Sequence, residues 1–246
     1  FFVKETPRRH LQQPGSASPE IHQSFKEMIK ALFKALKASP ALVMTIAGGV
    51  AFHFVLGAAT FDQLWYVQER GFDRAEIAQI TGWIGIVAGI SGNLFGGIGG
   101  DWFLRKTGLG RPMFLFFIML ALAPINLAYR LVDPGTFLFW AGGFAGFFQL
   151  GCFYGPTFAT VQELVSPQIR ATVVAFYILL LNMVGVAIGV SLAGVYIDFL
   201  LAEGATDPYT QALLWFTIIS FSAIPLFYLA GRRYDQDKQR LMESIG

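Results

Sequence analysis

The chain alternates between six long apolar segments and short polar breaks. The apolar segments span residues 41–66, 76–100, 112–132, 137–163, 171–200 and 209–230. Each reaches or exceeds the ~20 residues that a helix needs to cross a ~30 Å hydrocarbon core. Backbone amides cannot stay unpaired in lipid, and no alternating ten-residue strands are visible, so the segments are expected to be helices. The predicted fold class is an all-α membrane protein with six transmembrane helices.

The composition agrees with this class and excludes several others. Hydrophobic residues make up 54% of the chain, charged residues only 14%, and the mean hydropathy is +0.54, which excludes soluble, disordered and disulfide-rich proteins. The single Cys152 allows no internal disulfide, and three widely separated histidines predict no metal site. The net charge of +2 gives no reason to expect a nucleic-acid partner. No cofactor is expected.

Lys and Arg are distributed unevenly between the two sides of the membrane. Fifteen of the 18 lie before the first span, in the second and fourth breaks, or after the last span, and three lie on the other side: Arg70, Arg74 and Arg130. Cytoplasmic segments of membrane proteins carry the excess of Lys and Arg. Both termini are therefore expected in the cytoplasm, and the protein is expected to be a multi-pass protein of a bacterial inner membrane or its equivalent.

The apolar pattern divides the chain into three parts. Residues 1–40 form a linker that contains an amphipathic helix over 20–38, residues 41–231 form the transmembrane domain, and residues 232–246 form a cytoplasmic tail. The basic stripe on the predicted helix suits either an anionic cytoplasmic leaflet or a solvated face packed on loops. Its members are Lys26, Lys30, Lys34 and Lys37. The chain begins at Phe1 rather than Met, and we expect it to be a fragment or a processed half.

Glycine follows a pattern that predicts an internal repeat. The six spans contain 3, 8, 0, 5, 3 and 0 glycines in order, and a short sequence echo recurs about 96 residues later. The echo pairs Thr60-Phe61, Val67-Gln68-Glu69 and Arg74-Ala75 with Thr157-Phe158, Val161-Gln162-Glu163 and Arg170-Ala171. Three spans per repeat is an odd number, so the second copy must be inverted in the membrane. Inverted 3+3 repeats occur in transporters.

The glycines also predict which spans pack together. Helices approach closely in lipid where small residues line the contact. One stripe on the second span comprises Gly82, Gly85, Gly89, Gly92, Gly96 and Gly100, and a shorter one on the fifth span comprises Gly185 and Gly189. Spans one, two, four and five are therefore expected at the centre, with spans three and six facing lipid.

Motifs in the second break and in spans four and five resemble a known family. The sequence Gly97-x-x-x-Asp101-x-x-x-Arg105 resembles the loop signature of the major facilitator superfamily, although Trp102 stands where a basic residue is usual. Further residues resemble the Spinster-like branch: Gly155-Pro156, Gln162, Pro167, Arg170-Ala171, Asn182, Gly185 and Gly189. The resemblance implies the C-terminal half of a twelve-helix secondary transporter that works by alternating access. It also implies an N-terminal six-helix half as partner and a sphingolipid, lysolipid or other amphipathic cargo.

Charges at the cytoplasmic ends of the spans are candidates for a conformational latch. Asp101 at the C-terminal end of span two faces the negative end of its own helix dipole, which Arg105 can partly offset. Glu163 and Arg170 flank the fourth break and suggest a second pair. The resemblance favours a latch that includes Gly97. A loop salt bridge of little energetic worth is the alternative for the first pair, and a local structural pair for the second.

Five polar residues within the spans are candidates for lining a substrate cavity. They are His53, Asp62, Gln149, Tyr154 and Asn182. Polar groups within a membrane are costly and often functional, but inter-helix hydrogen bonds explain many of them. His53 either binds a headgroup, titrates during transport, or is a neutral imidazole bonded to a neighbouring helix; Asp62 lines an outer vestibule or is simply solvated. No carboxylate lies at mid-span, so if protons drive transport the titrating group is expected in the other half.

The dipeptide Gly155-Pro156 predicts a hinge or kink in span four, because proline lacks an amide hydrogen. The predicted function is secondary transport of a lipid-like or small organic solute. The alternatives are a major facilitator exporter of another class, carrying a drug, sugar or organic anion, and a six-span channel or structural membrane protein. An enzyme is not expected, since His-Glu-x-x-His and Gly-x-Ser-x-Gly motifs are absent.

Overall fold

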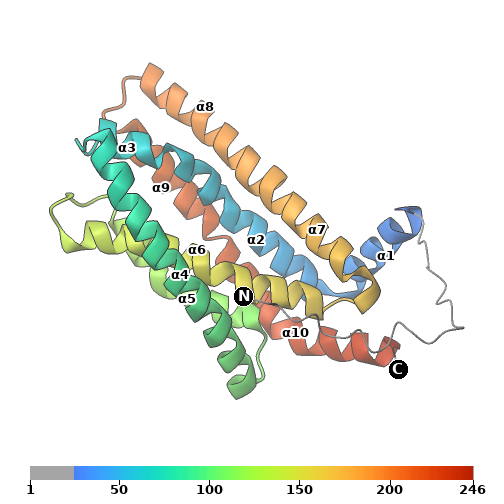
Figure 1. Cartoon of the computed structure of the whole chain (residues 1–246). Helices are drawn as coiled ribbons and strands as arrows, with labels where there is room; N and C mark the ends of the chain where they lie inside the picture. The colour runs from blue at the N-terminus through green and yellow to red at the C-terminus, as the bar shows by residue number, and fades with distance from the viewer. Residues whose placement is uncertain (1–24, 246) are drawn as a thin grey trace, which may run out of the picture.

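The computed structural model describes residues 25–245, and within them every regular element is a helix (Figure 1). The bounds are α1 Phe25–Ala38, α2 Pro40–Ala58, η1 Ala59–Phe61, α3 Asp62–Gln68, α4 Arg74–Thr107, α5 Arg111–Ala128, α6 Phe137–Glu163, η2 Pro167–Ile169, α7 Arg170–Leu180, η3 Leu181–Ala187, α8 Ile188–Ala202, α9 Pro208–Ser220 and α10 Ala223–Ile245. Six helical stretches are long and apolar enough to cross a membrane, which confirms the predicted number of spans. Span one combines α2, η1 and α3; span five combines η2, α7, η3 and α8; span six combines α9 and α10.

Local signals in the sequence explain where several helices begin and end. Asp73 precedes α4, and its carboxylate accepts hydrogen bonds from the first backbone amides of that helix at 2.8 and 3.0 Å. Gly108 ends α4 with φ at +71°, a left-handed conformation that glycine adopts without a steric penalty. Ser39 begins α2, with Pro40 at the first helical position. The polar breaks therefore act as helix boundaries through specific backbone chemistry.

The helices pair in the manner expected of an inverted repeat. Span one packs on span five, through α2 against η3 and α8, and span two packs on span four, through α4 against α6. Exchanging the first three spans for the last three converts one pair into the other. Span three packs on span four, and span six packs on span one in the same way. Spans three and six also contact each other. The 3+3 arrangement thus appears in the packing partners themselves.

Glycines make the two main helix contacts possible. A side chain at Gly96 would bring its Cβ within 2.5 Å of the Cys152 carbonyl oxygen on α6, and one at Gly189 would lie 2.7 Å from the Phe54 carbonyl oxygen on α2. The predicted stripe on α4 is only partly a contact surface, however. Gly92, Gly96 and Gly100 face α6, whereas a Cβ at Gly82 or Gly89 would meet nothing within 4 Å.

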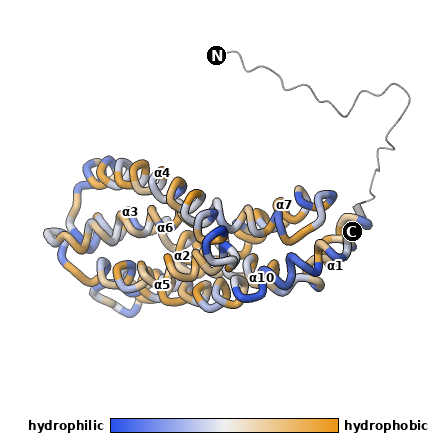
Figure 2. The backbone as a smooth tube through the Cα atoms, turned by 90° about the horizontal axis from the view of Figure 1, so that it is seen from below, coloured by the Kyte–Doolittle hydropathy of each residue, from blue (hydrophilic) through white to orange (hydrophobic). Residues whose placement is uncertain are grey.

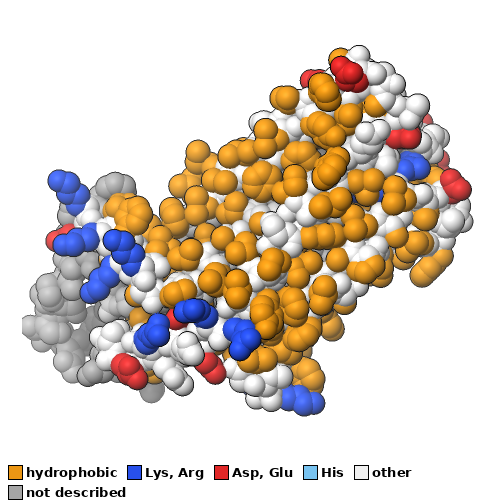
Figure 3. Space-filling model, turned by 180° about the vertical axis from the view of Figure 1, so that it is seen from behind, with side chains coloured by type: hydrophobic (Ala, Val, Ile, Leu, Met, Phe, Trp, Pro, Cys, Tyr) orange, Lys and Arg blue, Asp and Glu red, His pale blue; other side chains and the backbone are white. Residues whose placement is uncertain are grey.

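The prediction that spans two and five lie at the centre is wrong for this chain. The buried share of the most apolar stretch is 56% in span one, but only 22% in span two and 28% in span five. In spans three and six, which were expected to face lipid, the buried share is higher, at 33% and 39%. Spans two and five flank the bundle because each packs chiefly on one neighbour, while α2 lies at the centre and touches α6, η3, α8, α9 and α10. Hydrophobic side chains cover much of the face shown in Figure 3.

The transmembrane region begins where expected, with α2 starting at Pro40, but its C-terminal end differs from the prediction. Helix α10 continues without a break from Ala223 to Ile245, so residues 232–245 of the predicted tail extend the last span as a helix. Helix α1 occupies most of the predicted amphipathic segment; residues 20–24, like the linker before them, lie outside the described residues. Hydrophilic stretches of α1 and α10 lie at the same end of the bundle (Figure 2). Span five also contains a π-helical segment, η3, which the periodicity did not predict.

Candidate functional site

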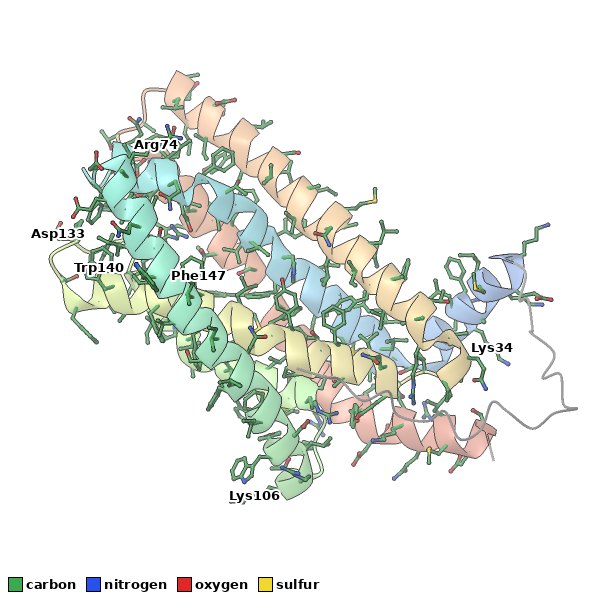
Figure 4. The ribbon with its side chains drawn as sticks, viewed as in Figure 1. Lys34, Arg74, Lys106, Asp133, Trp140 and Phe147 are labelled. Carbon is green, nitrogen blue, oxygen red and sulfur yellow. The ribbon has the colours of Figure 1, made fainter. Side chains whose placement is uncertain are left out.

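Charged side chains gather at the end of the bundle where α4 ends and α5 begins. On the face shown in Figure 3, most of the visible Lys and Arg side chains lie at one end of the molecule. We call this the basic end; it includes Arg105, Lys106 and Arg111, the start of α7, and the second half of α10. Lys106, labelled in Figure 4, marks the tip of α4.

Arg111 is the central residue of a charge network at the basic end. Its Nε donates to Asp101 Oδ1 at 2.8 Å and its Nη1 donates to Glu163 Oε2 at 2.8 Å. The Tyr234 hydroxyl also donates to Glu163, and Lys238 Nζ lies 3.7 Å from the same carboxylate. The network therefore joins the ends of α4, α5, α6 and α10. Only 12% of the Arg111 side chain is exposed, so its two ion pairs are partly shielded from water.

The acids of this network match the predicted latch residues, but their partners differ from the predicted ones. Asp101 pairs with Arg111 rather than with Arg105, and Glu163 pairs with Arg111 and Lys238 rather than with Arg170. Arg111 lies at the first position of α5, where its side chain can reach back toward the acids at the ends of α4 and α6. The predicted pairs were chosen by closeness in sequence, whereas Arg111 and Glu163 are 52 residues apart.

The predicted hinge and the latch glycine lie against each other. A Cβ at Gly155 on α6 would lie 3.5 Å from the Gly97 Cα on α4, so the two backbones are nearly in contact there. One turn further along α4, a Cβ at Gly100 would lie 3.2 Å from the Pro156 ring. Helix α6 continues through Pro156 as a single α-helix from Phe137 to Glu163. A bending role for Gly155-Pro156 stays a prediction.

A pocket of about 350 Å³ lies toward the opposite end, between α2, α3, α4, α5, α6 and α9. Most of its wall is apolar, with Phe52, Leu56, Phe147 and Leu150 among the lining residues. Phe147, labelled in Figure 4, lies on the face of α6 that approaches α4, where a Cβ at Gly85 would be 3.5 Å from its ring. Such a volume is in the lower part of the ~300–1,000 Å³ range of small-molecule sites.

Two of the five predicted cavity residues, Asp62 and Gln149, line this pocket. The Asp62 Oδ1 atom lies 3.0 Å from Arg130 Nη2, and the Arg130 side chain is only 3% exposed. Gln149 accepts a 2.7 Å hydrogen bond from Asn126 Nδ2, which comes from span three. The Asp62 carboxylate and the Arg130 guanidinium thus form an ion pair in the wall of the pocket.

Aromatic rings and a second arginine surround the Arg130 guanidinium. Its Cζ lies 5.0 Å from the centre of the Trp65 ring and 4.8 Å from that of Tyr129. Arg70 also stacks on Trp65, at 5.0 Å, and donates to the Arg130 carbonyl oxygen. The Trp65 indole in turn donates to the Thr210 hydroxyl at 2.7 Å, which ties this cluster to α9. Cation–π contacts and hydrogen bonds thus hold the buried arginine in one position.

The other three predicted cavity residues lie outside the pocket. The buried His53 ring donates from Nδ1 to the Gly49 carbonyl oxygen of its own helix at 2.8 Å, and its Nε2 lies 3.5 Å from the Tyr154 hydroxyl on α6. The alternative of a structural imidazole therefore fits its surroundings, although the hydrogen bond is within α2. Asn182 is exposed on η3 and donates to the Ile178 carbonyl oxygen at 2.9 Å. A cavity role for these three residues stays a prediction.

Sequence reasoning missed Arg111, Asn126 and Arg130 as site residues. Two signals for Arg130 were available. It is one of the three cations on the side that carries few, and it lies within the apolar segment 112–132, close to its end. Within residues 25–245 there is no group of three or more His, Cys, Asp or Glu side chains that could hold a metal ion.

Comparisons with known proteins support the architecture. A family model described as Major Facilitator Superfamily matches residues 1–190. Two solved structures of a bacterial homolog to the human lysosomal transporter Spinster are similar in fold. The inward-facing, unoccupied structure has a TM-score of 0.64 at 16% identity and covers 98% of this chain and 55% of that one. The inward-facing, occupied structure has a TM-score of 0.68 at 16% identity and covers 82% and 51%. No curated protein matches the sequence.

These findings bear directly on the predicted class. The chain spans about half the length of the two similar structures. The predicted resemblance to the major facilitator superfamily is confirmed, and the fold is similar to that of the two Spinster-homolog structures. Because the family model covers well over half of the residues, and the packing follows the inverted 3+3 pattern, the chain belongs to the Major Facilitator Superfamily.

Proposed function

We propose that this chain is one six-helix half of a secondary active transporter that moves an amphipathic or small organic solute by alternating access. The charge network around Arg111 is the observation that carries the proposal. It joins the ends of four helices at the basic end, where a change between inward-open and outward-open states must make or break contacts. Family membership supports transport rather than catalysis.

The exposed flanks of spans two and five suggest where a second half would sit. Helix α4 leaves Trp83, Val87 and Ile90 more than half exposed, and span five does the same with Met183 and Val195. In a twelve-helix transporter these faces would pack on the other six-helix half and line the path between the halves. Asn182, exposed on the same span, would then face that path. The Lys and Arg excess supports a cytoplasmic position for the basic end, both termini and the α1 stripe.

The network would act as a latch because its bonds are of intermediate strength. Asp101 is 54% exposed, so its pair with Arg111 contributes little, about 0–1 kcal/mol. Glu163 is less exposed and accepts from both Arg111 and Tyr234, and such charged hydrogen bonds contribute about 1.5–3 kcal/mol each. A network of this size can favour one state by a few kcal/mol, and substrate binding energy can still overcome it.

The proposal can be tested with Arg111→Gln in the complete protein, with Arg105→Gln as a matched control from the same end. The variant should shift the balance between states, seen as altered accessibility of cysteines placed on the exposed faces of α4 and α8. Counterflow of labelled lysolipid or sugar in proteoliposomes measures transport itself. We expect Arg111→Gln to change both readouts and Arg105→Gln to change neither. Equal behaviour of the two variants would contradict the latch, and no saturable uptake of any cargo would contradict transport.

A further inference from the structure

One charged side chain that lines the pocket, Asp62, has a second carboxylate oxygen that its ion pair with Arg130 does not use. Oδ1 of Asp62 is buried and 3.0 Å from Arg130 Nη2, but the side chain as a whole is 26% exposed. Its other oxygen, Oδ2, has no hydrogen-bond partner in the described part of the chain and is not among the buried unpaired atoms. A carboxylate can accept up to about four hydrogen bonds. Oδ2 is therefore an open acceptor in the pocket wall.

The positive partner of Asp62 is not open to the pocket in the same way. Arg130 is 3% exposed, and its Nε and Nη1 atoms are buried without a hydrogen-bond partner, among the rings of Trp65 and Tyr129. Both residues line the pocket, and Asp62 is the more exposed of the two, at 26% against 3%. The accessible electrostatic character of the site is therefore that of a carboxylate, even though the ion pair as a whole is neutral.

Several other polar groups of the pocket already have partners within the protein. Gln63 donates to the Thr81 hydroxyl at 3.0 Å, and Asn126 donates to Gln149 at 2.7 Å. The hydroxyls of Thr60, Thr217 and Ser220 donate to backbone carbonyl oxygens of their own spans. These donors are therefore already used, whereas Oδ2 of Asp62 is not.

The apolar part of the wall is rich in aromatic rings. Tyr66 and Tyr129 lie on the side of Asp62, and Phe52, Phe147 and Phe221 line the rest. Aromatic faces attract ammonium groups within about 6 Å, most strongly where water is excluded. A carboxylate with an open oxygen beside such rings is an arrangement suited to a protonated amine with an apolar body.

We infer that the pocket between spans one, two, three, four and six binds a small organic cation, with its ammonium on Asp62 Oδ2 and its apolar body against Phe52, Phe147 and Leu150. The volume of about 350 Å³ suits a compact molecule. The site lies within one six-helix unit, so the inference is separable from the proposed transport: binding needs no gradient and no second compartment.

Three probes of matched shape test the charge requirement on the complete protein in nanodiscs. Radiolabelled phenethylammonium is the cation, and unlabelled 2-phenylethanol and 3-phenylpropanoate compete as the neutral and anionic analogues. We expect saturable binding of phenethylammonium, competition by 2-phenylethanol at least about tenfold weaker, and no competition by 3-phenylpropanoate, since a charged hydrogen bond is worth about 1.5–3 kcal/mol. Equal competition by the alcohol, stronger competition by the carboxylate, or no saturable binding would each overturn the inference.

Two kinds of variant place the binding in this pocket. Asp62→Asn should weaken phenethylammonium binding at least about tenfold, but it leaves Arg130 without its partner and can impair folding. Gly146→Leu avoids that problem, because Gly146 lines the pocket and a Cβ there meets nothing within 4 Å. Gly135→Leu is its control, at an equally open glycine outside the pocket. We expect Gly146→Leu to abolish binding with an unchanged melting temperature and Gly135→Leu to bind normally. Normal binding by folded Gly146→Leu would overturn the site.

Discussion

Asp237 on α10 caps the start of α2, and its replacement gives a sharp test of how the basic end is held together. Its Oδ2 accepts from the Ala41 amide at 2.7 Å and from the Ser39 hydroxyl at 3.0 Å, across 196 and 198 residues of sequence. The residue is 3% exposed. A buried carboxylate at a helix N-terminus satisfies amides that the helix itself leaves unpaired, and its charge interacts favourably with the helix dipole.

The expected cost of Asp237→Asn follows from these contacts. An asparagine oxygen in the place of Oδ2 can still accept both hydrogen bonds, but it lacks the charge that strengthens them. Hydrogen bonds to a charged group contribute about 1.5–3 kcal/mol, against about 0.5–1.5 kcal/mol for neutral ones. The dipole interaction adds about 0.3–1 kcal/mol. We therefore expect a loss of about 2 kcal/mol, or about 4–8 °C in melting temperature for a chain of this length.

Thermal unfolding of the purified protein, followed by loss of its monodisperse peak in size-exclusion chromatography, measures this loss. Asp235→Asn is the matched control, because Asp235 is two residues away on the same helix and exposed. The control should melt like the unaltered protein. If both variants melt at the same temperature, the carboxylate of Asp237 does not contribute as a cap, and the reasoning fails.

Two further predictions concern α4. Gly96→Ala should destabilise the protein by about 1–3 kcal/mol, because the added Cβ would lie 2.5–2.8 Å from the Cys152 backbone. Gly89→Ala, where the added Cβ meets no atom within 4 Å, should be neutral or slightly stabilising. Equal melting temperatures of the two variants would contradict this prediction. Hydrogen bonds from the first α4 amides hold the pKa of the Asp73 carboxyl below its ordinary value. The stabilisation from this helix cap is therefore complete at pH values above the ordinary pKa, and it is lost as the pH falls through the lowered pKa. Hydrogen-exchange protection of those amides, corrected for intrinsic rates, should fall only in strong acid, and a loss near neutral pH would argue against the cap.

The fold was largely predictable because the membrane restricts the options. Six apolar stretches of sufficient length can only be helices in lipid, and an odd number of spans per repeat forces inversion. The packing order was harder to predict. A glycine in a span suggests a close helix contact, but it does not show which neighbour makes that contact. Gly82 and Gly89 were therefore included in the predicted stripe, although a Cβ on either would meet nothing within 4 Å. The central position belongs to α2, whose three glycines are fewer than the eight of span two.

The site was less predictable because its contacts join residues far apart in sequence. Asp62 and Gln149 were found because polar groups in apolar spans are conspicuous. Their partners Arg130 and Asn126 were not found. Each pairing exists only because the end of span three lies beside spans one and four in the folded bundle. The same reason explains Arg111, whose nearest acid in sequence, Asp101, is ten residues away. Pairing by short sequence separation selected Arg105 instead.

The π-helical segment η3 changes how the rest of span five must be interpreted. One extra residue in a turn rotates everything after it by about 100° relative to an uninterrupted α-helix. Gly189 lies just beyond this segment, where it allows α8 to approach Phe54 of α2. Deleting a single residue between Leu181 and Ala187 would restore regular winding and turn Gly189 away, presenting a bulkier neighbour to a gap that accepts no side chain. The part of span five that follows η3 thus depends on this irregular segment for its alignment.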